Sequence, residues 1–248
     1  MNFWKHAPTP LPFVPAPIIS MLQKLSLPQI ASLLDVSAVQ ANSTKKDVQN
    51  FADLAIRYDC KAVFALSCFL DFLRDYRSEH GGNFLIGTGV GFPSGATTTA
   101  LKVQEAKSIL TMGVDEIDMM INVSFLLSGL YQEALDDIRA VKQAIGDIPL
   151  KVIIECHYFD NDLMCRAAEM VVDSGAQWVK TGTGWAPTGA TYENVALLKK
   201  TVGDAVKIKA SGGIRNLEII QNMFELGVER FGVGNSASTI LEEAATLC

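Results

Sequence analysis

Histidine is scarce in this sequence of 248 residues, and its cysteines are not paired. There are three histidines, and the five cysteines are odd in number and scattered, without a CxxC pair. The cysteine pattern gives no disulfide framework and the two residue types together give no zinc motif, so we predict neither a metal nor a cofactor. Unpaired cysteines suit a reducing compartment, and a cytoplasmic location is expected. His157 follows a strand-like run and stays open as a ligand or base.

An excess of basic charge and long uninterrupted apolar runs are also missing. The formal net charge is −6, which leaves no basic stripe to neutralise the phosphates of a nucleic acid. Residues 1–20 are largely apolar, but five prolines interrupt them, which excludes the continuous helix of a signal peptide or membrane span. We therefore expect a small-molecule substrate, no nucleic-acid or membrane partner, and an extended, proline-rich N-terminal arm over residues 1–29.

After the arm, one structural unit recurs along the chain. Each unit has a short run of apolar and β-branched residues, a turn, and a segment with apolar residues at helical spacing. The starts of the runs are about 20 to 35 residues apart, enough for a strand and a crossover helix. No break in composition interrupts this α/β pattern. It therefore predicts a single (β/α)₈ TIM barrel that spans residues 30–248, and not an open doubly wound sheet. The predicted strands are 32–37, 62–67, 84–90, 116–121, 151–156, 178–183, 207–212 and 230–235.

Charged residues occupy alternate positions on several predicted strands. Because side chains alternate in direction along a strand, Lys207 and Lys209 should both face the barrel lumen. The same alternation turns Glu116 and Asp118 inward from the fourth strand. Lys180 lies on the sixth strand, beside the strand of Lys209. Active groups of this fold lie at the C-terminal ends of the strands, so these inward residues are candidates for catalysis.

Two of these lysines are expected to lie within a few ångströms of each other, because neighbouring strands are about 4.8 Å apart. Burial and a nearby cation both lower the pKa of a lysine. We therefore predict that either Lys180 or Lys209 titrates near pH ~7 instead of roughly 10.4 and acts as a nucleophilic amine. The alternative is a purely structural ion-pair network of the lysines with Asp118 and Glu155.

Glycine-rich turns follow the seventh and eighth predicted strands, with the sequences "ASGGI" and "GVGNS". Glycine lets backbone N–H groups approach an anion closely, and this end of the fold commonly binds phosphate. The alternative for each turn is a tight connection without a ligand. The candidate phosphate-binding residues are Gly212, Gly213, Gly232, Gly234 and Asn235.

Several motifs occur in order along the predicted barrel: "LLDVS" near residue 33, "GFPSGATTT" (91–99), "DEIDMMIN" (115–122), "KVIIE" (151–155), "VKTGTG" (179–184) and "KASGGIR" (209–215). With these motifs the sequence resembles the deoxyribose-phosphate aldolase family, which are class I aldolases. The resemblance implies that Lys180 is the Schiff-base lysine, that Lys209 lowers its pKa, and that Asp118 completes a proton relay. It also suggests a homodimer.

The implied reaction is the reversible cleavage of 2-deoxy-D-ribose 5-phosphate to acetaldehyde and glyceraldehyde 3-phosphate. Asp35 and Ser37 match polar residues of the family's first strand and are expected to contact substrate hydroxyls. Thr181 and Gly184, beside the nucleophile, are further candidate substrate contacts. Two alternatives stay open: a related lysine-dependent aldolase or acyl-transferring lyase acting on a different phosphorylated sugar, and a catalytically silent barrel that serves as a binding module.

The sequence departs from the family's pattern at positions near the expected site. Gly182 stands where the family usually has serine, and Gly234 and Asn235 replace a common pair of serines at the phosphate end. Trp185 adds bulk beside the nucleophile loop, and Phe64 stands where the family often has a smaller residue, frequently cysteine. We therefore expect a reshaped pocket with an altered acceptor specificity.

Overall fold

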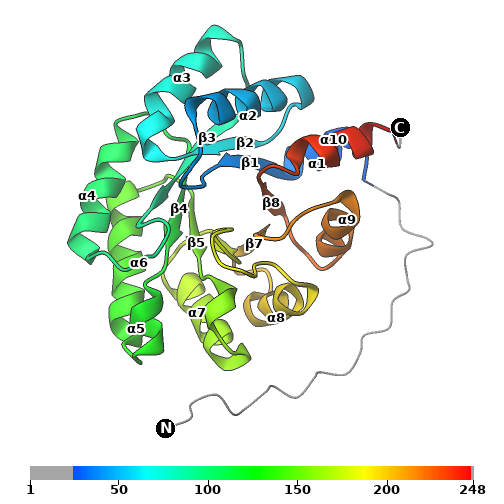
Figure 1. Ribbon diagram of the computed structural model, residues 1–248. Coiled ribbons are helices and arrows are strands. Elements are labelled where there is room, and N and C mark those ends of the chain that lie inside the picture. The colour runs from blue at the N-terminus through cyan, green and yellow to red at the C-terminus, as the bar shows by residue number, and fades with distance from the viewer. Residues whose placement is uncertain (1–24, 247–248) are drawn as a thin grey trace.

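Eight parallel strands close into a barrel in the computed structural model, which describes residues 25–246 (Figure 1). Each strand pairs with its neighbours in chain order, and β8 pairs with β1 to close the ring. The predicted TIM barrel is confirmed. The strands are β1 (Leu34–Ala38), β2 (Ala62–Ala65), β3 (Leu85–Val90), β4 (Glu116–Met120), β5 (Leu150–Ile153), β6 (Trp178–Lys180), β7 (Lys207–Ser211) and β8 (Arg230–Val233).

Helices surround the barrel and cover its outer surface (Figure 1). Their buried residues recur at helical spacing, as Val48, Ala52 and Ala55 do on α2, so each helix presents one apolar stripe to the strands. The helices are α1 (Leu27–Leu33), α2 (Lys45–Tyr58), α3 (Leu70–Glu79), α4 (Thr99–Leu110), α5 (Val123–Leu127), α6 (Tyr131–Ile145), α7 (Asn161–Asp173), α8 (Tyr192–Val202), α9 (Leu217–Glu225) and α10 (Ala237–Thr246), with short 3₁₀ helices η1 (Ser67–Phe69) and η2 (Cys156–Tyr158).

The barrel domain begins earlier than the sequence predicts. Helix α1 starts at Leu27, within the predicted arm of residues 1–29, because Ser26 and Gln29 form a capping box there. The helix lies beside α10 (Figure 1) and buries Ile30 completely. Residues 27–29 therefore belong to the packed domain, and Leu25 and Ser26 directly precede them, whereas residues 1–24 of the predicted arm lie outside the described residues.

Strands β5 and β6 are shorter than predicted, and one residue explains both differences. Glu155 has a φ of 54°, in the left-handed region, which turns the chain out of the sheet after β5. Its carboxylate accepts hydrogen bonds from the N–H (3.1 Å) and the hydroxyl of Thr183, which holds the chain after β6 in a loop. As a result Lys180 is the last residue of its strand and stands at the mouth of the barrel.

Strand β3 carries glycine at two positions that face the lumen, and aromatic rings fill the space. A Cβ atom on Gly87 would lie 2.3 Å from Cζ of Phe64, and one on Gly89 would lie 2.7 Å from Cβ of Phe92. These contacts are far closer than real Cβ atoms tolerate, so the two glycines are required by the two phenylalanines.

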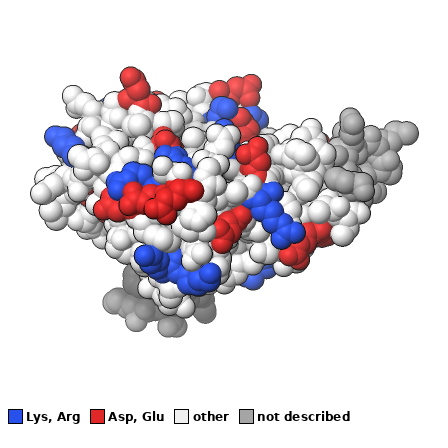
Figure 2. Space-filling model, turned by 90° about the horizontal axis from the view of Figure 1, so that it is seen from above, with Lys and Arg blue, Asp and Glu red and all other residues white. Residues whose placement is uncertain are grey.

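On the face shown in Figure 2, basic side chains lie among acidic ones and form no continuous stripe. Within residues 25–246, no helix is both long enough and apolar enough to cross a membrane.

Candidate active site

Asp118, on β4, lies at the centre of a buried charge cluster in the barrel lumen. Its Oδ2 atom accepts hydrogen bonds from Nζ of Lys180 at 2.7 Å and from Nζ of Lys209 at 2.8 Å. Asp118, Lys180 and Lys209 are 2%, 6% and 0% exposed. Three residues that the sequence predicts to converge from β4, β6 and β7 therefore meet at one oxygen atom.

The cluster continues deeper into the barrel through further ion pairs. Nζ of Lys209 lies 2.6 Å from Oδ2 of Asp35, and Nζ of Lys151 lies 2.8 Å from Oε2 of Glu116. Arg230 joins the two carboxylates, since its guanidinium bonds to both. Lys207, which was also predicted to face the lumen, is instead exposed and pairs with Glu229. It is the first residue of β7 and so lies at the open end opposite the site.

The pKa values of Lys180 and Lys209 shift in opposite directions. Burial lowers the pKa of Lys180 to about 8, with Lys209 contributing and Asp118 opposing the shift. Burial also acts to lower the pKa of Lys209, but Asp118, Asp35 and Glu116 outweigh it and raise that pKa. Lys180 is therefore the lysine that gives up its proton first, as one of the pair was predicted to do.

Glu155 takes no part in ion pairs with the lysines, so that element of the predicted alternative network is wrong. Its side chain is 2% exposed and bonds to Thr183 instead. A Cβ atom on Gly182 would lie 2.7 Å from Oε1 of Glu155, which accounts for the glycine at this position. Glu155 thus anchors the loop that follows the nucleophile.

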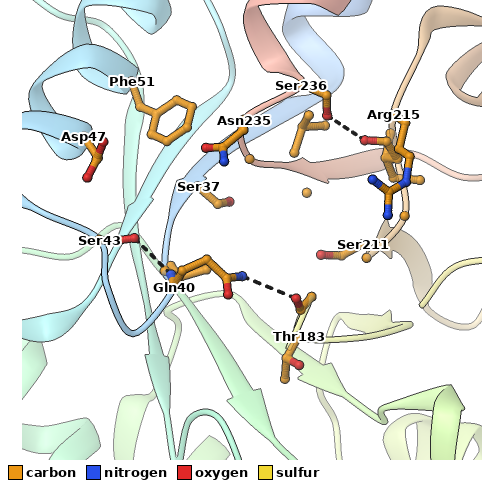
Figure 3. Close-up of a pocket in the computed structure, with 18 of the residues that line it drawn as sticks. Ser37, Gln40, Ser43, Asp47, Phe51, Thr183, Ser211, Arg215, Asn235 and Ser236 are labelled. Atoms are coloured by element: carbon orange, nitrogen blue, oxygen red, sulfur yellow. Dashed lines mark hydrogen bonds between the residues drawn. The ribbon is translucent and has the colours of Figure 1, made fainter. Parts of the chain in front are cut away.

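Lys180 lines a pocket of about 670 Å³, and Figure 3 shows this pocket with its labelled side chains. Most of the predicted substrate and phosphate contacts line it, namely Ser37, Gly184, Gly212, Gly213, Gly232, Gly234 and Asn235. The other two predicted contacts, Asp35 and Thr181, are fully buried and are not among the lining residues. Asp35 pairs with Lys209, and the Thr181 hydroxyl bonds to the backbone of Ser211. Both therefore lie in the barrel interior and wall instead of at the substrate surface.

Arg215 is a site residue that sequence reasoning missed. It lies across the pocket from Asp47 (Figure 3), and apart from Lys180 it is the cationic side chain among the lining residues. The signal was present in "KASGGIR", but that motif was interpreted through its glycines alone. Ser236 also lines this wall, and α10 starts directly after it, so the N-terminal end of a helix faces the same region.

The loop after β6 is tied to the loops around it. Nε1 of Trp185 donates to the carbonyl of Val39 at 2.9 Å, and the indole packs edge-on against the ring of Phe92. Farther along, Nδ1 of His157 lies 2.7 Å from Oγ1 of Thr188. His157 therefore supports this loop and does not contact the charge cluster. Within the described residues, no group of three or more histidine, cysteine or acidic side chains is arranged to hold a metal ion.

A second, smaller cavity of about 60 Å³ lies on the other side of Lys180. Its walls combine apolar residues, among them Phe64, Leu66 and Phe92, with polar ones, namely Ser37, Ser67, Thr88, Glu105, Asp118 and Lys180. Lys180 thus lines both the large pocket and the small cavity.

The fold is that of the TIM-barrel enzymes, and the site places a buried lysine of lowered pKa at the end of a barrel strand, where the active groups of this fold lie. The family model described as "DeoC/LacD family aldolase" matches residues 30–237. The chain belongs to this family of aldolases, which are lyases.

Relatives named "Deoxyribose-phosphate aldolase" include those of Klebsiella pneumoniae subsp. pneumoniae, 43% identical over 85% of both chains, and Sinorhizobium medicae, 44% identical over 86% of this chain and 85% of the relative. Among solved structures, a putative deoxyribose-phosphate aldolase from Coccidioides immitis superposes with a TM-score of 0.84 at 29% identity, covering 90% of this chain and 88% of the other. The enzyme from Aeropyrum pernix, described as a tetramer, gives 0.77 at 25% identity, covering 89% of this chain and 93% of the other.

Proposed function

We propose that this protein is a class I aldolase that reversibly cleaves 2-deoxy-D-ribose 5-phosphate to acetaldehyde and glyceraldehyde 3-phosphate. Membership of the DeoC/LacD family and the relatives named deoxyribose-phosphate aldolase support this substrate. The observation that carries the proposal is the buried pair of Lys180 and Lys209 on one oxygen of Asp118, with their pKa values shifted apart.

In cleavage, the neutral amine of Lys180 attacks the aldehyde carbon of the open-chain sugar, and the carbinolamine loses water to give an iminium ion. Loss of the proton from the C3 hydroxyl breaks the C2–C3 bond, releases glyceraldehyde 3-phosphate and leaves an enamine on Lys180. Protonation of the enamine carbon and hydrolysis then release acetaldehyde. Asp118 and Lys209 are placed to exchange protons with the nitrogen of Lys180, a contribution worth roughly 10²–10⁴-fold in rate.

The phosphate is proposed to bind at the wall of the large pocket that holds Arg215. There the Gly212 and Gly213 turn and the Gly234 and Asn235 turn meet a guanidinium group and the start of α10. Backbone N–H groups at such turns, together with a cation, favour a bound anion. Ser37 lines both cavities and is proposed to contact a substrate hydroxyl.

Borohydride reduction in the presence of acetaldehyde, followed by mass mapping, tests the nucleophile. We expect a mass increase on the peptide that contains Lys180 and none in the Lys180→Met variant. Labelling confined to other peptides would contradict the assignment, and no labelling at all would favour a catalytically silent barrel.

The substrate needs a separate assay of acetaldehyde release from 2-deoxy-D-ribose 5-phosphate. Release is expected, and it should weaken at least about tenfold in kcat/KM for Arg215→Ala because a charge-assisted contact to the phosphate is lost. Labelling of Lys180 without cleavage of this sugar would instead indicate an aldolase for a different phosphorylated sugar.

We also propose a cytoplasmic location and a homo-oligomeric assembly. The cysteines of the described residues are free, which supports a reducing compartment. The homodimer rests on the family resemblance alone, and the relative from Aeropyrum pernix is described as a tetramer. Light scattering of the purified protein would distinguish a monomer, dimer and tetramer.

A further inference from the structure

We infer that Phe64 determines which donor aldehydes the enzyme accepts, by narrowing the cavity in which the carbons of the donor lie. The inference rests on the proposed function, because it concerns the aldehyde held as an imine on Lys180. It assigns a specificity role to a residue that belongs to no ion pair and lies on β2, away from the strands that carry the lysines and Asp118.

The two cavities beside Lys180 differ in the chemistry they can hold. The pocket of about 670 Å³ has polar walls with Arg215 and Asn235, which suit a phosphorylated acceptor. The cavity of about 60 Å³ is much smaller and has the rings of Phe64 and Phe92 in its walls beside polar residues such as Thr88 and Glu105, which suits a short donor without a phosphate. Because both cavities reach Lys180, the donor fits the small one, and the new carbon–carbon bond forms at the border between them.

The small cavity has less than a tenth of the volume of the large pocket, about 60 Å³ against about 670 Å³. When acetaldehyde forms an imine, its oxygen leaves as water and two carbons stay attached to Nζ of Lys180. Propanal would bring a third carbon into a cavity that the ring of Phe64 bounds.

Phe64 is a rigid wall because it is held on two sides. The ring lies so close to Gly87 that a Cβ atom there would meet three ring atoms at 2.3 to 2.7 Å. The ammonium group of Lys209 lies over the ring, 3.9 Å from its centroid, a distance at which a cation is attracted to the π face. With the side chain 3% exposed, the ring is enclosed between Gly87 of β3 and the ammonium group of Lys209.

Phe92, the other aromatic wall, also packs against a glycine of β3, Gly89, but it is less buried than Phe64. It is only half-buried and lies in the loop after β3, where its ring contacts the exposed indole of Trp185. A loop side chain next to an exposed neighbour can adjust its position. Phe64, on a barrel strand, is therefore the residue that fixes the size of the cavity.

The experiment measures kcat/KM for the addition of acetaldehyde and of propanal to glyceraldehyde 3-phosphate, in wild type and in Phe64→Ala and Phe64→Leu. One added carbon in a tight apolar site changes selectivity by about 10–200-fold. We expect the propanal to acetaldehyde ratio to rise by that amount in Phe64→Ala and by a smaller amount in Phe64→Leu. The matched control is Phe231→Leu, since Phe231 is equally buried but faces the helices from β8, and its ratio should stay at the wild-type value.

Circular dichroism and thermal unfolding establish that each variant is folded, and Phe64→Leu carries the test if Phe64→Ala does not fold. A ratio within twofold of wild type in a folded Phe64 variant overturns the inference, as does a wild-type enzyme that uses both donors equally well. Failure of the proposed function is distinct, because wild-type Lys180 would then not be labelled by acetaldehyde and borohydride at all.

Discussion

Lys180 and Lys209 bind the same oxygen of Asp118, yet their surroundings give them opposite tendencies to hold a proton. They are partners in the register of β6 and β7, and both are buried. Lys209 has a second carboxylate, Asp35, at 2.6 Å, whereas the one ion pair of Lys180 within the described residues is with Asp118. The second carboxylate beside Lys209 helps to raise the pKa of that lysine, whereas burial lowers the pKa of Lys180.

Replacing Lys209 with methionine should raise the pKa of Lys180, because the neighbouring cation that disfavours its protonation is gone. We expect kcat at pH 7 to fall by about 10²–10⁴-fold and the pH dependence of imine formation to move to higher pH. Borohydride trapping of acetaldehyde at a series of pH values measures this shift. Lys207→Met, on the same strand but exposed, should leave the profile unchanged, and an unchanged profile in Lys209→Met would refute the role assigned to Lys209.

The wild-type pH profile follows from the lowered pKa of Lys180. Since the neutral amine is the nucleophile, kcat/KM should rise with pH and reach half of its limiting value near the pKa of about 8. A profile that is flat between pH 6 and pH 9 (roughly one unit or more on either side of that pKa) would contradict this.

The lowered pKa of Lys180 also makes the free energy of unfolding depend on pH, and the direction of this dependence is defined. The unfolded chain binds more protons at Lys180 between about pH 8 and its ordinary pKa of 10.5, so the stabilising contribution is full above 10.5 and lost as the pH falls through 8. The raised pKa of Lys209 acts with the opposite sign, because its contribution is present at low pH and lost as the pH rises. The pH dependence of the kinetics therefore reports the titration of Lys180 more directly than the pH dependence of unfolding does.

Gly189→Ala should weaken the binding of the phosphorylated acceptor and spare the donor. A Cβ atom at this position would lie 2.4 Å from the carbonyl oxygen of Gly212, so the turn of Gly212 and Gly213 must shift. We expect KM for glyceraldehyde 3-phosphate to rise about tenfold or more, which corresponds to the loss of one charge-assisted contact, while acetaldehyde labelling of Lys180 stays normal. Gly203→Ala, where the added Cβ has no atom within 4 Å but the φ of 55° strains any side chain, controls for a destabilising change outside the pocket. Equal effects of the two variants would count against the prediction.

A fully buried ion pair outside the lumen gives a prediction for stability. Nζ of Lys102 lies 2.5 Å from Oδ2 of Asp137 and also donates to the carbonyl of Met120 at the end of β4. Lys102→Met leaves an unpaired buried carboxylate and should destabilise the protein by about 3–5 kcal/mol, measured by urea unfolding. The double variant Lys102→Met with Asp137→Leu should recover most of this loss. A double variant no more stable than the single one would show that packing, and not charge, sets the cost.

Strand alternation predicted the direction of the inward charges but could not predict their depth. Asp35 is expected to contact the substrate, but it is buried beneath Lys209. Lys207 is expected to face the lumen, but it is exposed at the opposite end of the barrel. Depth depends on how far each strand is staggered in the closed barrel. The early ends of β5 and β6 could not be predicted from the sequence either. They follow from the contact of Glu155 with Thr183, two residues that only the folded chain brings together.

The ring of Phe64 occupies the space that a side chain at position 87 would need. This constrains the order in which the two positions can change during evolution. A side chain at position 87 is sterically forbidden while the ring is present, whereas a smaller residue at position 64 needs no earlier change. Mutational paths that alter this part of the lumen must therefore begin on β2 and only afterwards proceed to β3. The two positions should covary among descendants of this protein, with the glycine free to drift only in lineages that have already lost the aromatic ring.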